Sequence, residues 1–197
     1  MKKLTLAILI SLILCAAANI ASNAAEVEGL TEKFVRVHVI ANSDSEDDQA
    51  LKLKVRDAVL NVSEDILSGC QDKKSALERI RKNLSELQAA AGQAVSDNGY
   101  SYSVSCTLQK EQFDTRVYDD FTLPAGDYDS LCIRIGSSEG RNWWCVFYPQ
   151  LCIGAAMKID DSGILTDGEL KIVKEPEKVR YKLWCYEVIK KLKSLLN

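Results

Sequence analysis

The side chains able to do chemistry are few and widely spaced in this 197-residue sequence. His38 is the single histidine, so a Ser-His-Asp triad or a Cys-His dyad would have to use it as the base. Two adjacent carboxylate pairs, Asp119-Asp120 and Asp160-Asp161, have the residue type that glycosidases use. Adjacency in sequence does not place two carboxylates across a substrate, and both pairs lie near predicted turns. We therefore expect no catalytic residues.

Motifs that bind metals and cofactors are missing from the sequence. A single histidine excludes a His-rich zinc site, and no Cys-x-x-Cys pair exists to build a thiolate site or a redox motif. No P-loop or Gly-x-Gly-x-x-Gly pattern occurs. A net charge of −3 argues against a general nucleic-acid binder. The sequence thus predicts no metal, no cofactor and no nucleic-acid partner.

The first 25 residues have the pattern of an export signal. Lys2 and Lys3 precede an apolar run from Leu4 to Ala18, and small residues follow up to Ala25. The run is short for a helix that spans a bilayer, so we expect a signal peptide at 1–25, with an uncleaved anchor as the alternative. Membrane contact is expected only through this segment or through a partner.

Six cysteines follow the signal, and an even number in an exported chain favours disulfides. Cys145 and Cys152 are the best candidate pair, because a bend at Pro149 brings them together. Export permits this bridge, but no spacing rule demands it. The apolar surroundings of other cysteines are also typical of free buried thiols, namely at Cys106, Cys132 and Cys185.

The segment 34–60 predicts a strand, a polar loop and a capped helix. Alternating β-branched residues indicate a half-buried strand over 35–41. The loop 42–45 has residues that favour turns, and Ser45 with Asp48 forms a variant capping box at the start of the helix. Apolar residues then recur at helical spacing, which indicates one buried face.

The rest of the chain alternates between helical and strand patterns. Further elements are expected at 72–97 (helix), 100–109 and 116–122 (strands), 128–135 and 142–147 (a hairpin), from Thr166 (short helix) and at 177–196 (last helix). These patterns predict an α+β fold over 30–197, as a single domain. We expect a mostly antiparallel sheet with helices packed on one face.

Two adjacent tryptophans, Trp143 and Trp144, lie in the last predicted strand. Neighbouring residues of a strand point to opposite faces, so one ring can anchor the core while the other is partly exposed. An exposed tryptophan beside Arg141 would be a good protein-binding hot spot. The alternative, that both rings are packed, remains open, because tryptophan is highly buried on average.

Four strings of residues in this order and spacing resemble the stage II sporulation protein R family over about residues 30–152. They are His38-Val-Ile-Ala-Asn-Ser-Asp44, Asp48-Gln-x-Leu-Lys-x-x-Val-Arg-Asp-Ala-Val59, Leu123-Pro-Ala-Gly-x-Tyr128 and Asn142-Trp-Trp-Cys-Val146, the last followed by Pro149 and Leu151-Cys152. The chain departs from the family pattern at Pro149-Gln150, where the family tends to carry Pro-Pro, and at 113–116, where its usual proline is absent.

The resemblance implies a non-enzymatic signalling protein of endospore formation. Members are made in the forespore and exported into the space between the two membranes. There they activate a membrane-embedded aspartic protease of the mother cell that processes the sigma-E precursor. For the contact surface we expect the polar edge of the first motif with the tryptophan pair, that is Arg36, His38, Asn42, Asp44, Trp143 and Trp144.

The rival interpretation is an exported peptidoglycan hydrolase that uses the paired carboxylates. The two classes differ in what they predict. A signalling protein triggers precursor cleavage without its acidic pairs, whereas a hydrolase turns over cell wall and needs them.

Overall fold

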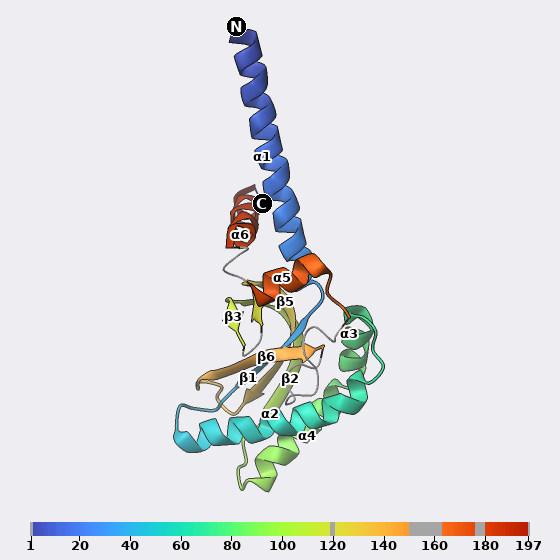
Figure 1. Ribbon diagram of the computed structural model, residues 1–197. Coiled ribbons are helices and arrows are strands. Elements are labelled where there is room, and N and C mark those ends of the chain that lie inside the picture. The colour runs from blue at the N-terminus through green and yellow to red at the C-terminus, as the bar shows by residue number, and fades with distance from the viewer. Residues whose placement is uncertain (1, 119–120, 150–162, 176–179, 197) are drawn as a thin grey trace. The chain divides into compact units, whose positions relative to one another are not determined.

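A computed structural model describes residues 2–118, 121–149, 163–175 and 180–196 of the chain (Figure 1). Its residues form two compact units, which are described separately. One unit comprises residues 33–113 and 127–164 and contains the main sheet. The other comprises residues 1–32, 114–126 and 165–197.

The main sheet has four strands in the order β2-β5-β1-β6. Their bounds are β1 Val35–Ile40, β2 Val104–Phe113, β5 Gly126–Ile135 and β6 Asn142–Tyr148. The central strand β1 is parallel to β5 and antiparallel to β6, so His38 lies opposite Cys132 on one side and Trp144 on the other. β2 runs antiparallel to β5, since Ser103 accepts from the Gly136 amide while Glu111 lies near Cys132.

Helices α2 (Glu46–Leu67), α3 (Lys73–Lys82) and α4 (Leu84–Asp97) belong to the same unit, and α2 and α4 lie along one side of the sheet (Figure 1). The apolar stripe of α2 and every second residue of β1 are buried and form the core. They are Leu51, Val55 and Val59 on the helix and Val35, Val37 and Val39 on the strand. Alternation along β1 then places Arg36 and His38 on the other face of the sheet.

The helix ends follow the capping residues of the sequence. The Ser45 hydroxyl accepts from the Asp48 amide, which confirms half of the predicted capping box. The other half was wrong, because the Ser45 amide donates to Ser43 Oγ. Asp72 forms a full capping box with Ser75. Gly99, with a φ of 81°, stops α4 in the left-handed conformation. The prediction of one helix over 72–97 was wrong, because the chain breaks at Asn83, whose side chain bonds back to Arg79 O.

The second unit gathers the two ends of the chain. α1 (Lys2–Thr31) lies beside α6 (Arg180–Leu196) and also contacts α5 (Asp167–Lys174) (Figure 1). Thr166 and Glu169 form the capping box of α5, which confirms the short helix predicted from Thr166. The strands β3 (Arg116–Val117) and β4 (Thr122–Leu123) pair antiparallel.

The α+β class is confirmed, and two of the three strand pairings in the main sheet are antiparallel. The strand expected at 100–109 begins later, because Tyr100 and Tyr102 stack on each other before β2 starts. The Asp119-Asp120 and Asp160-Asp161 pairs lie outside the described residues. The division into a targeting segment at 1–25 and one domain at 30–197 stays a prediction.

Candidate functional site

The loop after β1 is organised by one buried carboxylate, Asp48. Its Oδ2 accepts hydrogen bonds from Ser43 Oγ at 2.5 Å and from Asn42 Nδ2 at 2.8 Å. These hydrogen bonds, with that from Ser43 the larger contribution, hold the pKa of Asp48 below its usual value of 3.8. The carboxylate therefore does more than complement the helix dipole, because it fixes the shape of the loop between β1 and α2.

A second loop, residues 136–141 between β5 and β6, binds to this first loop. Asn42 Oδ1 accepts from the Ser137 amide at 2.9 Å, and the Glu139 and Gly140 amides donate to Asn42 O and Ala41 O. The approach at Gly140 is close, because a Cβ atom there would clash with Ser43 O. We call residues 41–48 and 136–141 together the paired loops.

The exposed edge of the paired loops carries opposite charges. Asp44 Oδ1 accepts from the Arg141 amide at 2.6 Å and lies 3.4 Å from Arg141 Nε. Behind them the buried Lys52 donates to Arg141 O at 2.9 Å, and burial lowers the pKa of its ammonium group. The Arg141 side chain is 72% exposed, so its guanidinium remains accessible to a partner.

Arg36 does not lie on this edge, contrary to our prediction. It is fully buried, its Nε donates to Cys145 O at 3.0 Å, and its guanidinium lies 4.3 Å from the Phe113 ring and 5.1 Å from the Tyr128 ring. A guanidinium can be buried when aromatic faces and a carbonyl replace its water. Arg36 therefore has a structural role in the face of the sheet opposite α2.

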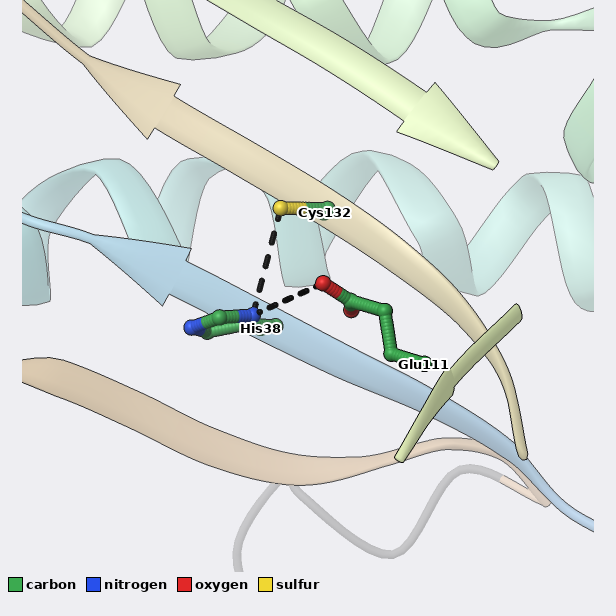
Figure 2. Close-up of side chains that lie close together, drawn as sticks. All are labelled: His38, Glu111 and Cys132. Atoms are coloured by element: carbon green, nitrogen blue, oxygen red, sulfur yellow. Dashed lines mark hydrogen bonds and ion pairs between the residues drawn. The ribbon is translucent and has the colours of Figure 1, made fainter. Parts of the chain in front are cut away.

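His38 is buried as well, with 5% of its surface exposed, so it is not part of an exposed contact surface. Its ring stacks on Trp144 with the centroids 3.4 Å apart. Its Nδ1 lies 3.3 Å from Glu111 Oε1 and 3.9 Å from Cys132 Sγ. Figure 2 shows both side chains directed at this one nitrogen. Burial lowers the pKa of His38 below 6.5, and the nearby Glu111 carboxylate offsets this only in part.

Trp143 and Trp144 lie on opposite faces of β6. Trp143 pairs with Val39 and packs under the Arg56 guanidinium of α2, whose carbon lies 4.9 Å from the ring centroid. Trp144 pairs with His38 on the other face and meets Phe113 edge to face at 4.7 Å. Both rings are half-buried, so each contributes to packing and keeps a partly accessible surface.

The cysteines of the described residues differ in whether they are disulfide-bonded or free thiols. Cys145 is disulfide-bonded, whereas the free thiols of the described chain include the buried Cys106, Cys132 and Cys185. Cys152, which we predicted as the partner of Cys145, lies outside the described residues, so that pairing stays a prediction. Burial raises the pKa of Cys132 to about 11 and that of Cys106 to about 12, so both thiols are protonated at neutral pH.

The cluster of His38, Glu111 and Cys132 was missed in the sequence. Each residue occupies an ordinary position of a strand pattern. Glu111 is 73 positions and Cys132 is 94 positions from His38 along the chain. No short motif joins them. Only the strand order β2-β5-β1, which periodicity does not specify, brings the three side chains together.

The N-terminal helix is the one described helix that is long and apolar enough to cross a membrane by length and composition, over Thr5–Thr31 with a mean hydropathy of 2.2. An N-terminal signal sequence has the same properties. The chain thus combines an N-terminal apolar helix, consistent with a signal peptide or an anchor, with an α+β unit. The profile of the family described as Stage II sporulation protein R (spore_II_R) matches residues 31–158, and the chain belongs to this family.

The chain is similar to the Stage II sporulation protein R of Bacillus subtilis (strain 168), with 36% identity over 126 residues. The match covers 62% of this chain and 55% of the relative, so the chain spans little more than half the length of that protein. No solved structure matches the chain.

Proposed function

We propose that this chain is an exported intercellular signalling protein of endospore formation. In this proposal it acts from the space between the forespore and mother-cell membranes. It triggers a membrane-embedded aspartic protease of the mother cell, which then processes the sigma-E precursor. The protein acts by contact and performs no catalysis itself.

The observation that carries the proposal is family membership over residues 31–158. The N-terminal apolar helix supports it, because such a helix delivers the rest of the chain across a membrane or holds it there. The match to the Bacillus subtilis relative lends the same support, since that protein is named for the same stage of sporulation.

For the contact surface we propose the exposed edge of the paired loops. Asp44 and Arg141 present two opposite charges there, and Trp143 follows directly in β6 as a half-buried aromatic ring. Arginine and tryptophan are the residue types that contribute most to binding at protein interfaces. Asn42, in contrast, is engaged in holding the two loops together.

Co-expression with the protease and the sigma-E precursor in a non-sporulating host tests the function. We expect cleavage of the precursor only when all three proteins are present. A chain that binds the protease without precursor cleavage would be a binding module of another kind. Turnover of purified peptidoglycan that is lost on substitution of Asp119 or Asp160 would instead establish the hydrolase interpretation.

The contact surface is tested in the same system with Arg141→Ala. The change removes the exposed guanidinium and its 3.4 Å ion pair with Asp44, while the backbone amide and carbonyl of Arg141 keep their bonds to Asp44 and Lys52. We expect precursor cleavage to fall roughly thirtyfold, because a hot-spot residue contributes about 2 kcal/mol or more to binding. Lys74→Ala, at an exposed position of α3, is the matched control and should leave cleavage unchanged. Equal cleavage by both variants would exclude this edge.

A further inference from the structure

Three potential ligand atoms lie close together on the face of the sheet opposite α2. His38 Nδ1, Cys132 Sγ and an oxygen of Glu111 are all within 4.8 Å of one another. They come from the adjacent strands β1, β5 and β2. His38 and Cys132 are buried, and the Glu111 side chain is 16% exposed.

Hydrogen bonds within this cluster leave two of its polar atoms without a partner. The Cys132 thiol has a side-chain hydrogen bond with Glu111, but His38 Nε2 and one carboxylate oxygen, the buried Glu111 Oε2, have no hydrogen-bond partner among the described residues. Glu111 Oε1 and Cys132 Sγ both lie nearest to the same ring nitrogen, at 3.3 and 3.9 Å (Figure 2). An imidazole nitrogen carries either a hydrogen or a lone pair, so it can donate to the carboxylate or accept from the thiol, but not both.

A nucleophilic Cys-His-Glu triad does not fit this arrangement. In a triad the nucleophile and the orienting carboxylate bond to different nitrogens of the imidazole, so that the ring can pass a proton between them. Here both groups meet at Nδ1. Three groups that converge on one point are the arrangement expected of ligands around an ion.

We propose that His38, Glu111 and Cys132 form a binding site for Zn²⁺, with the fourth coordination position open to water or another ligand. Tetrahedral zinc with bonds of 2.0–2.3 Å places its nitrogen, oxygen and sulfur ligands about 3.3 to 3.6 Å apart. The nitrogen and oxygen of the cluster already have this separation. The sulfur lies 3.9 Å from the nitrogen and within 4.8 Å of the oxygen, so it would move closer to both on binding.

The chemistry of the ligands selects this class of metal. Mg²⁺ and Ca²⁺ take oxygen ligands, whereas zinc accepts the mixture of nitrogen, oxygen and thiolate found here. Binding forms the Zn–S bond as the Cys132 S–H bond breaks, and the proton leaves to solvent. A thiolate, a carboxylate and a neutral imidazole around Zn²⁺ sum to zero charge, which suits a buried site.

The surroundings hold two of the ligands in place. Trp144 stacks on the His38 ring with an angle of 18° between the planes, and Gln109 Nε2 donates to Glu111 Oε1 at 3.0 Å. Such contacts orient metal ligands in known sites. A bound ion would link the strands β1, β2 and β5 through one side chain of each. The inference does not depend on the signalling function.

The site is tested by zinc titration of the full chain in detergent, after treatment with a chelator. We expect one Zn²⁺ per chain, and with Co²⁺ as a spectroscopic substitute we expect a thiolate-to-metal charge-transfer band. Cys132→Ser and Glu111→Gln should each weaken zinc binding roughly tenfold or more. Glu111→Gln keeps the side-chain size and can still accept from Gln109, so it tests the ligand without disturbing the fold.

Cys106→Ser is the matched control. Cys106 is also a buried free thiol, but it lies five positions from Glu111 on β2 and so faces the other side of the sheet. This variant should bind zinc like the unaltered chain. The proposal is overturned if the unaltered chain binds no stoichiometric zinc or shows no cobalt–thiolate band. Equal binding by Cys132→Ser, or equal loss in Cys106→Ser, would overturn it as well.

Discussion

At the scale of single residues, the family motif around Asn42, Ser43 and Asp48 describes a hydrogen-bonded loop. Asp48 is negatively charged, 4% exposed, and compensated by hydroxyl and amide donors and by the start of α2. A buried carboxylate is tolerated only when it is bonded in this way. The polar residues that first suggested a contact surface are therefore in part structural.

Replacing Asp48 by alanine leaves Ser43 and Asn42 without their acceptor. We expect the free energy of unfolding to fall by about 2 kcal/mol, because hydrogen bonds to charged groups are among the stronger ones. Urea unfolding of the full chain in detergent measures this. The control is Asp47→Ala, at an exposed neighbour in the same helical turn, where we expect a loss of about 0.5 kcal/mol. Equal losses of unfolding free energy in the two variants would show that the interaction with the helix dipole alone accounts for the contribution of Asp48 to stability.

The same carboxylate predicts a dependence of stability on pH. Its pKa is lowered in the folded chain, so its stabilisation is fully present above the unfolded value near 3.8 and disappears as pH falls through the folded value. The difference in unfolding free energy between the unaltered chain and Asp48→Asn should therefore be constant from pH 7 to pH 5 and shrink below pH 4. Urea midpoints measured across this range check the prediction, which a constant difference down to the lowest pH would contradict.

At the scale of secondary-structure elements, the paired loops join two connections that are far apart in sequence, from β1 to α2 and from β5 to β6. The hairpin predicted from 128–135 and 142–147 was wrong, because β1 lies between β5 and β6 in the sheet. The loop 136–141 lies on the loop 41–48 through backbone hydrogen bonds and one close approach at Gly140. The register of β1 against β5 and β6 brings these loops to the same edge of the sheet. Their exposed residues, including Arg141, are thereby held in one place.

Gly140→Ala tests this packing, because the new methyl group would clash with the Ser43 carbonyl and the Ala41 side chain. We expect a loss of about 1–3 kcal/mol of stability, as for other overpacked sites, and a lower urea midpoint. Gly92→Ala is the matched control, since the space around Gly92 in α4 is open. That change should stabilise the chain by about 0.5–1 kcal/mol, because glycine weakens a helix interior. A neutral Gly140→Ala would mean that the loops move apart at little cost.

Local sequence signals predicted the helix caps and the strands well, because they act within a few residues. Helices begin after the N-caps Ser45, Asp72 and Thr166, and α4 ends before Gly99, which has a positive φ. The burial of Arg36 was not predictable in this way. It depends on Phe113 and Tyr128, which reach it from β2 and β5.

At the scale of the whole molecule, the N-terminal apolar helix is consistent with a signal peptide or an anchor. We expect deletion of residues 2–20 to abolish export, because it removes both lysines and the apolar run. Fractionation and protease accessibility of the expressed chain measure this. A second variant, in which Lys2 and Lys3 are replaced by Ser and the apolar run is kept, should reduce export less than the deletion. Export of the 2–20 deletion would show that this helix is not the signal.

The sequence by itself determined the α+β class, the capped strand-loop-helix at 34–60 and membership of the family, because short-range periodicity, capping and ordered motifs carry that information. Only the tertiary structure decided that Arg36 and His38 are buried and that Glu111 and Cys132 meet His38. Strand order and register set these contacts across 73 to 109 residues of chain, and no local preference of the backbone specifies them.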